Sequence, residues 1–346
     1  MSPRYKVLVF GASYGSLFGT KVAAAGHDAT LICQRATAEL INREGTKVQF
    51  PVRGGEAVEI DSRALPGRVR AATPVAIEAA EYDLAVLAMQ EPQYGAPGVR
   101  ELLDRTAKAG VPCLSLMNMP PPPYLRRIPG LGADLPAGCY ADSTVWQGFQ
   151  PAAMTLCSPD PQALRPAGGP RNALRVTLPT NFKAARFASD EHTAILRRLE
   201  AGIGMLDTPV KLKVHDSLFV PLAKWAMLLA GNYRCVTPDG PRSICDAVHA
   251  DPGRARSVYD WVRELCVALG AAPEDLVPFE KYAAAAANLA APSSAARAIF
   301  AGAPHIERVD KLVQAIGARR GLQHPEVDGI VRLIDERLAA NRRAAA

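Results

Sequence analysis

The first part of the chain alternates short apolar runs with turns and helical stretches. The run YKVLVF at 5–10 is continuous and rich in β-formers, 11–19 is punctuated by glycines, 20–26 has helical character, and DATLIC at 28–33 is a second apolar run. A strand, a glycine turn, a helix and a parallel strand in this order predict a right-handed βαβ unit.

Two further apolar runs follow, YDLAVLAM at 82–89 and VPCLSLMN at 111–118, with a helical stretch between them. Their nearly unalternated apolar character is typical of buried parallel strands. They lead into Gln90 and Asn118, and ligands of open α/β sheets bind at this carboxyl edge. The sequence PPPPY at 120–124 predicts a stiff polyproline segment at the same edge.

From about residue 209 the pattern changes to long helical periodicities that continue almost to the end of the chain. We therefore predict an α/β fold with a Rossmann-type doubly wound parallel sheet, followed by an all-helical second domain. The expected division is a dinucleotide-binding domain over 1–208 and a substrate-binding domain over 209–346.

Lys224 stands in an otherwise apolar stretch, LFVPLAKWAMLLAGNYR at 218–234. A lysine taken out of water has a lowered pKa and becomes a candidate proton donor. The alternative is an amphipathic helix whose lysine extends its ammonium into water. Asn232 lies about 80° round a regular α-helix from Lys224, so both side chains can border one pocket.

The glycine-containing turn after the first strand is a candidate phosphate site. Its residues Gly11, Ser13, Tyr14 and Gly15 open a predicted helix, where backbone N–H groups and the helix dipole favour a pyrophosphate. The spacing departs from G-x-G-x-x-G because Ser13 stands where the second glycine is expected. A tight turn with close helix packing and no ligand is the alternative.

The residues after the second strand bear on the choice of dinucleotide. Gln34 and Arg35 stand where an acidic residue would hold the ribose of NAD. Arg35, together with Gln34, would instead contact the 2′-phosphate of NADP. A surface arginine at the start of a loop is the alternative.

Composition narrows the class of protein. The 346 residues are 49% hydrophobic and 21% charged, with a net charge of +6. Basic residues are spread along the chain, which disfavours nucleic-acid binding and suits small anionic ligands. We find no signal peptide, no membrane span and no metal-ligand spacing, and the seven cysteines are an odd set without C-x-x-C. A cytoplasmic protein with reduced thiols is expected.

The chain resembles the ketopantoate reductase family nearly end to end. The resemblance lies in VLVFGASYGSLFGTKVAAAGHDATLICQR, YDLAVLAMQEPQ, LSLMN, PLAKWAMLLAGN, DAVHADPGRARSVYDWVRELCVALG and APSSAARAIFAGAPHIERVDKLV, in that order. It implies an NADPH-dependent 2-oxo acid reductase, often dimeric, with a Rossmann domain and a helical domain like that of 6-phosphogluconate dehydrogenase.

The resemblance also implies roles for single residues. Lys224 would be the catalytic lysine and Glu307 the acidic residue that orients the reacting groups. Asn232 and either Ser293 or Ser294 would hold the substrate. The two serines could instead cap a helix, Asn232 could end one, and Glu307 could be a solvated helical charge. Asn118 would lie beside the nicotinamide.

Departures from the family pattern concern the substrate and cofactor contacts. Gln90 replaces a lysine, Leu228 replaces an asparagine one turn after Lys224, and MNM replaces QNG at 117–119. These changes favour a more apolar 2-oxo acid than ketopantoate. Two alternatives are an opine or imine dehydrogenase that reduces a C=N bond, and a non-catalytic NADPH-binding sensor.

Overall fold

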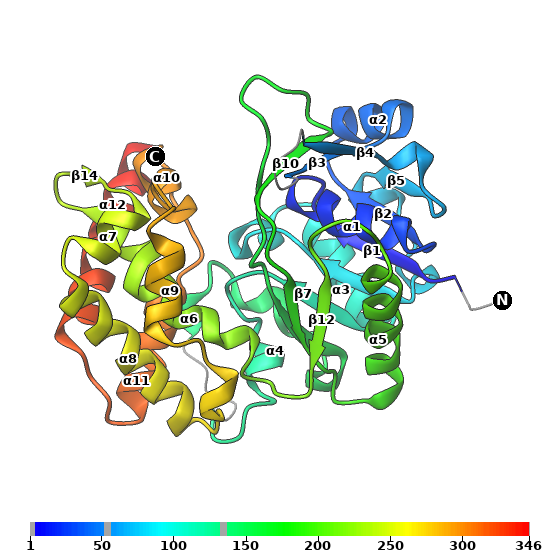
Figure 1. Ribbon diagram of the computed structural model, residues 1–346. Helices are drawn as coiled ribbons and strands as arrows, with labels where there is room; N and C mark the ends of the chain where they lie inside the picture. The colour runs from blue at the N-terminus through cyan, green and yellow to red at the C-terminus, as the bar shows by residue number, and fades with distance from the viewer. Residues whose placement is uncertain (1–3, 52–56, 132–136, 346) are drawn as a thin grey trace. The chain divides into compact units, whose positions relative to one another are not determined.

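The computed structural model describes residues 4–51, 57–131 and 137–345, which form two compact units (Figure 1). The first unit comprises the described residues within 1–89, 93–127 and 144–216. The second comprises those within 90–92, 128–143 and 217–346. The chain therefore leaves the first unit twice before its helical part begins.

An eight-stranded sheet forms the centre of the first unit, in the order β12-β11-β8-β7-β6-β1-β2-β5. All neighbouring strands are parallel except β8 and β11. The strands are β1 (Lys6–Phe10), β2 (Asp28–Ile32), β5 (Val69–Ala72), β6 (Leu84–Leu87), β7 (Cys113–Leu116), β8 (Met154–Ser158), β11 (Phe182–Ala185) and β12 (Leu212–His215). The predicted Rossmann-type sheet is thus confirmed, including the parallel βαβ unit of β1 and β2.

Helices pack on this sheet through their apolar sides. They are α1 (Tyr14–Ala24), α2 (Arg35–Glu44), α3 (Val99–Lys108) and α5 (Asp190–Gly204). In α5, Ser189 caps the first turn by accepting a hydrogen bond from the backbone N of His192 at 3.1 Å, and Leu196 and Leu199 are fully buried. Helix α1 contacts both β1 and β2.

One charged side chain of α1 is completely buried. The ammonium of Lys21 donates to the Thr208 hydroxyl at 2.5 Å and to the Pro209 carbonyl, and it lies 4.5 Å from the centre of the Phe50 ring. Burial, and to a smaller extent the nearby Lys211 charge, lowers the Lys21 pKa to about 7.

A second, four-stranded sheet lies in the first unit, in the order β4-β3-β10-β9. Its strands are β3 (Lys47–Phe50), β4 (Val58–Asp61), β9 (Gln162–Leu164) and β10 (Ala173–Leu178). Apolar and polar positions alternate in burial along β3 and β10, so only one face joins the core.

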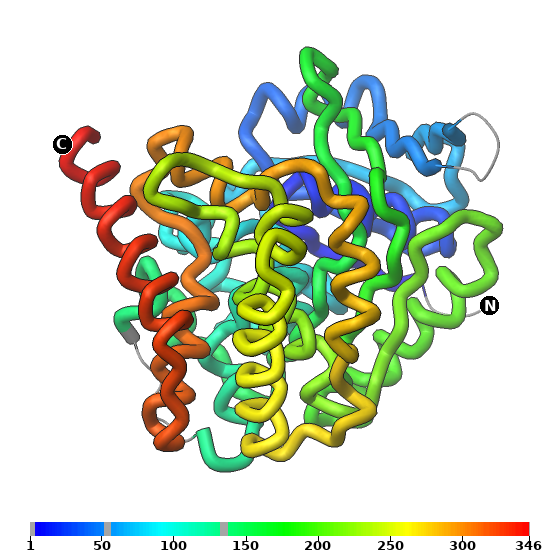
Figure 2. The backbone as a smooth tube through the Cα atoms, turned by 60° about the vertical axis from the view of Figure 1, so that its left-hand side comes forward, coloured from blue at the N-terminus to red at the C-terminus, as the bar shows by residue number. Residues whose placement is uncertain are grey.

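The second unit is helical, as predicted. Its helices are α6 (Lys224–Met227), α7 (Ile244–His249), α8 (Pro252–Ala268), α9 (Phe279–Ala286), α10 (Ser294–Phe300), α11 (Val309–Arg319) and α12 (Pro325–Ala345), the last being the long red helix of Figure 2. A small hairpin pairs β13 (Val236–Thr237) with β14 (Gly240–Pro241). Helix α8 starts at Pro252 after the cap Asp251, which accepts from the backbone N of Arg254 at 2.9 Å. No helix within the described ranges has the length and apolarity that a bilayer crossing requires.

Two local expectations were wrong. The segment 120–124 is not a polyproline stretch throughout: Pro121 is extended, but Pro122–Leu125 form the short helix α4, because proline fits the first turn of a helix. The helical periodicity expected from about residue 209 becomes helical only at Pro221, since β12 runs to His215 and an irregular stretch follows.

Candidate functional site

The turn between β1 and α1 requires glycine at its first position. Gly11 has φ +103°, and its backbone N donates to the carbonyl of Ile32 at the end of β2, at 3.0 Å. A Cβ here would lie 2.8 Å from Cγ of Met89 and 3.0 Å from the carbonyl oxygen of Ala88. The chain therefore crosses the end of β6 in backbone contact, which no larger residue permits.

The next two glycines serve helix packing. A Cβ at Gly15 would lie 2.7 Å from Cγ1 of Val9, and one at Gly19 would lie 2.9 Å from Cδ2 of Leu31. Both glycines let α1 approach β1 and β2 closely, as the packing alternative for this motif assumes. Ligand binding by the turn stays a prediction.

The N-terminus of α1 has the features of an anion site. Ser13 is exposed, makes no side-chain capping bond, and the first turn has no acidic residue. The first N–H groups of a helix have no intrahelical acceptor and carry partial positive charge. Tyr14 could contribute only its backbone, because its hydroxyl donates to the carbonyl of Pro161 at 2.7 Å and burial raises its pKa.

Helix α2 presents a second N-terminus of this kind. Gln34 is its extended N-cap and Arg35 its first residue, and both are exposed. This helix also has no acidic residue in its first turn and no side-chain cap. The Arg35 guanidinium lies at the positive end of the helix dipole, where a positive charge is unfavourable without a counterion. An anion bound here would be stabilised both by the guanidinium and by the helix dipole.

The polar residues after β6 and β7 belong to different units. Asn118 follows β7 by two residues in the first unit and is half-buried. Gln90 follows β6 by three residues, is exposed, and belongs to the second unit together with Glu91 and Pro92.

The segment that carries Lys224 is not a regular α-helix. It consists of a 3-10 turn at Pro221–Ala223, α6, a π-helical turn at Leu228–Asn232, and a second 3-10 turn at Tyr233–Cys235. Lys224 is half-buried at the start of α6. The 80° separation expected for Asn232 is therefore wrong. A π turn inserts one residue, or about 100° of rotation, so Asn232 comes to within about 20° of the Lys224 direction.

Ser293 is tied to Asn232 through the backbone. Its hydroxyl donates to the carbonyl of Asn232 at 2.7 Å and accepts from the backbone N of Ala296 at 3.1 Å. Ser293 is 2% exposed and caps α10, as the capping alternative proposed, whereas Ser294 is exposed. The chain continues helically beyond Asn232, so this residue does not end a helix. Substrate contacts by these three residues stay predictions.

Glu307 is buried in the loop before α11, so its interpretation as a solvated helical charge is wrong. The hydroxyl of Tyr233 donates to the backbone carbonyl of Glu307 at 2.6 Å and accepts from the backbone N of Val309 at 3.0 Å. Tyr233 directly follows Asn232, so one residue links the π turn to the Glu307 loop. The structure thus brings Asn232, Ser293 and Glu307 together in the second unit.

Sequence reasoning missed Glu91, which joins this group from the first half of the chain. Its backbone N donates to Oε1 of Glu307 at 3.3 Å, and both its carboxylate oxygens accept from the backbone N of Ala141 at 3.1 Å. Glu91 is 2% exposed, and burial raises its pKa to about 7, with a further contribution from Glu307. The signal was an acidic residue four positions beyond a buried strand, in MQEP.

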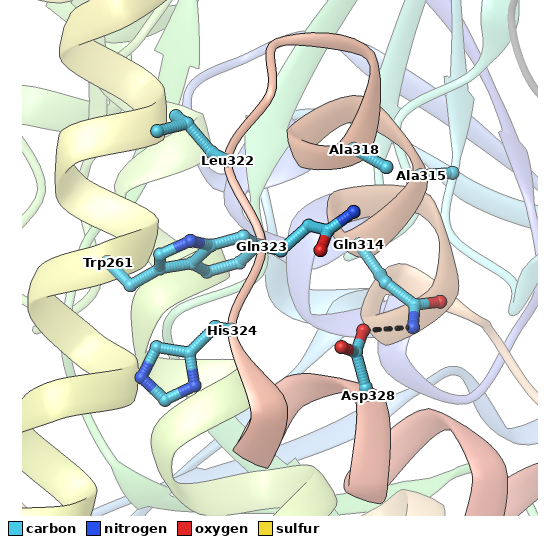
Figure 3. Close-up of a pocket in the computed structure, with 8 residues that line it drawn as sticks. All are labelled: Trp261, Gln314, Ala315, Ala318, Leu322, Gln323, His324 and Asp328. Atoms are coloured by element: carbon cyan, nitrogen blue, oxygen red, sulfur yellow. Dashed lines mark hydrogen bonds between the residues drawn. The ribbon is translucent and has the colours of Figure 1, made fainter.

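A surface pocket of about 190 Å³ lies elsewhere in the second unit, between α8, α11 and the start of α12 (Figure 3). Two of its polar contacts are internal or to a neighbour: Gln314 donates to Asp328 at 2.6 Å, and His324 Nε2 is hydrogen-bonded to Ser257 at 2.9 Å. The Trp261 ring packs edge-on against His324. None of the predicted site residues lines this pocket.

Comparison with known proteins gives matches only in structure. No family model and no curated protein matches the sequence. A PanE/ApbA family ketopantoate reductase from Ralstonia eutropha JMP134 superposes with a TM-score of 0.67 at 16% identity, over 97% of this chain and 99% of that one. The 2-dehydropantoate 2-reductase from Methylococcus capsulatus gives 0.65 at 15%, over 97% of each chain. A D-mandelate dehydrogenase with NADH and anilino(oxo)acetate gives 0.63 at 13%, over 97% and 99%. The chain therefore has the fold of the ketopantoate reductases, as its sequence predicted.

Proposed function

We propose that this protein reduces the carbonyl of a 2-oxo acid to the 2-hydroxy acid with NADPH. The observation that carries the proposal is the pair of helix N-termini that follow β1 and β2. These strands are parallel neighbours, so the Gly11 turn and Arg35 lie at the same edge of the sheet. The Gly11 turn favours the pyrophosphate of a dinucleotide. The N-terminus of α2, with Arg35, favours a phosphate that can pair with the guanidinium.

The names of the structural neighbours support an oxidoreductase. Ketopantoate reductases and a D-mandelate dehydrogenase share the fold over nearly the whole chain, and the latter was solved with NADH and a substituted 2-oxo acid. Arg35 favours NADPH over NADH in this chain. The opine or imine dehydrogenase and the NADPH-binding sensor are the competing functions.

The second unit supplies the groups that a carbonyl reduction needs. Bound NADPH would supply the hydride. Lys224 donates a proton or a hydrogen bond to the carbonyl oxygen, which becomes the alkoxide. The Asn232 amide and the exposed Ser294 hydroxyl hold the substrate carboxylate, and Glu307 orients the reacting groups from its buried loop.

The cofactor assignment is tested by binding. We expect NADPH to bind more tightly than NADH, and Arg35→Ala to remove most of this preference because the 2′-phosphate loses its ion pair. Arg43→Ala is the matched control, since Arg43 lies in the last turn of the same helix and pairs with Glu44 at 2.8 Å. Equal affinities for the two cofactors in the unmodified protein would contradict the assignment.

The reaction is tested by NADPH oxidation against 2-oxo acids with small, branched and aromatic side chains, with and without amines. We expect turnover without an amine and a preference for apolar side chains. A strict requirement for an amine would favour the opine or imine dehydrogenase. Tight NADPH binding without turnover of any compound would favour the sensor. A homodimer and a cytoplasmic location stay predictions, and sedimentation and fractionation can check them.

A further inference from the structure

The π turn at Leu228–Asn232 contains an inserted side chain. The hydroxyl of Tyr282, from α9, donates to the carbonyl of Met227 at 3.1 Å. In a regular α-helix this carbonyl would accept from the backbone N of Gly231. Immediately beyond the insertion the backbone N of Tyr233 donates to the carbonyl of Leu228, five residues back. An inserted group is a recognised cause of such a break in the helical ladder.

Gly231 makes the insertion sterically possible. A Cβ at this position would overlap the Tyr282 hydroxyl and lie 3.2 Å from its Cζ. Gly231 is buried, and the next nearest atom to such a Cβ is Cγ2 of Ile244, at 3.5 Å. The small residue and the tyrosine hydroxyl therefore occupy one space that an ordinary helix would close.

Tyr282 is held rigidly for this role. Its ring stacks on Tyr259 with centroids 5.3 Å apart and an interplanar angle of 16°, and it packs edge-on against Phe279. Only 6% of Tyr282 is exposed. A side chain fixed by two aromatic neighbours can hold a helix in the π conformation because it loses little freedom when its hydroxyl inserts.

We propose that Tyr282 is a positioning residue for substrate binding, which it serves by holding the π turn that aligns Asn232 with Lys224. Without the extra residue of the turn, the Asn232 side chain would point about 100° away from its present direction. The inference rests on the proposed function only in its last step, the use of Asn232 by substrate. The hydrogen bond from Ser293 to the Asn232 carbonyl secures the far end of the same turn.

The test is the pair of changes Tyr282→Phe and Gly231→Ala, made singly and together. Tyr282→Phe removes the inserted hydroxyl but keeps the aromatic stack. The double variant also fills the vacated space with a methyl group and raises helix propensity, so the regular α-helix should form. We expect the crystal structure of the double variant to lack the π turn. KM for the 2-oxo acid should rise about tenfold or more, the size expected for the loss of one charge-assisted hydrogen bond, and NADPH affinity should be unchanged.

A double-mutant cycle with Asn232→Ala separates positioning from a general structural effect. If Tyr282 acts through Asn232, adding the Tyr282→Phe and Gly231→Ala changes to Asn232→Ala should raise KM for the 2-oxo acid little above that of Asn232→Ala alone. Tyr259→Phe is the matched control, because its hydroxyl donates to the Val277 carbonyl at 2.9 Å and does not touch the π turn. If Gly231→Ala prevents folding, Tyr282→Phe alone can still be tested for the π turn in its crystal structure and for KM of the 2-oxo acid.

Three results would overturn the inference: a π turn that persists in the double variant, an unchanged KM, or effects that multiply with those of Asn232→Ala. Failure of the proposed function is distinguishable from these. An unmodified protein that reduces no 2-oxo acid would refute the function, whereas the variant structures would still decide whether Tyr282 holds the π turn.

Discussion

Replacing Glu91 by glutamine should change how the stability of the protein depends on pH. The side chain is buried, its carboxylate accepts from the backbone N of Ala141, and Glu307 lies beside it. The other titratable groups that act on or respond to Glu91 are Asp142 and Tyr140. Glutamine keeps the shape and one acceptor oxygen but cannot ionise, so the variant isolates the cost of the buried charge.

The magnitude follows from the raised pKa. The pKa of Glu91 rises from 4.5 to about 7. Between these values the unfolded chain is ionised while the folded protein keeps the proton, so stability falls as pH rises through this window. At 1.36 kcal/mol for each pKa unit, the full loss from this group is about 3 kcal/mol. Glutamine has no such loss, so the variant gains stability relative to the unmodified protein as pH rises.

The assay is urea denaturation of the two proteins from about pH 5 to about pH 8. We expect the difference between their unfolding free energies to change by about 2 to 3 kcal/mol over this range. Glu264→Gln, at an exposed position on α8, should give parallel profiles. Parallel profiles for Glu91→Gln as well would refute the reasoning, because Glu91 would then be ionised in the folded protein over the whole range.

Three further predictions concern other buried groups and the candidate proton donor. Because burial lowers the Lys21 pKa to about 7, the folded protein loses the Lys21 ammonium proton above about pH 7, whereas the unfolded chain keeps it to about pH 10. Through Lys21 alone, stability should therefore rise by roughly 2 kcal/mol between pH 7 and pH 9. Urea denaturation of Lys21→Met should lack this rise, and an equal rise in both proteins would contradict it. Lys224→Ala should lower kcat by roughly 10²-fold with NADPH affinity intact, and Lys281→Ala, an exposed lysine of α9, should not; retained turnover would reject the role of Lys224. Gly317→Ala should lower the free energy of unfolding by about 1–3 kcal/mol in thermal melts, because its methyl group would lie 2.7 Å from Cζ2 of Trp261. Adding Trp261→Phe should restore part of this stability, unless a backbone shift relieves the clash instead.

The parts of this fold that depend on local patterns could be predicted from the sequence. Continuous apolar runs gave β1, β2, β6 and β7, because buried parallel strands need apolar side chains on both faces. The four-stranded second sheet was not predicted, since its short strands alternate and pair across more than a hundred residues, as β3 does with β10. The helix α4 was not predicted because proline is compatible both with polyproline and with a first helical turn.

The candidate site shows the same division. Lys224, Asn232 and Glu307 could be picked out by residue type and resemblance, but their arrangement depends on partners far along the chain. The π turn depends on Tyr282, which lies outside 218–234, and Gly231 within that stretch does not by itself predict the turn. Glu91 meets Glu307 across 216 positions, and burial rather than local sequence sets its pKa.

Two early segments of the chain, within 90–92 and 128–143, belong to the second unit, and this affects how the protein folds. The described residues of both segments are translated well before Ser217, yet they belong to the helical unit. Glu91 donates through its backbone N to Glu307, and Ala141 donates in turn to the Glu91 carboxylate. A fragment that begins at Ser217 would lack these residues, including the Glu91 N–H that donates to the Glu307 carboxylate. We expect such a fragment to be poorly folded, so the helical unit cannot be exchanged between proteins as one continuous cassette.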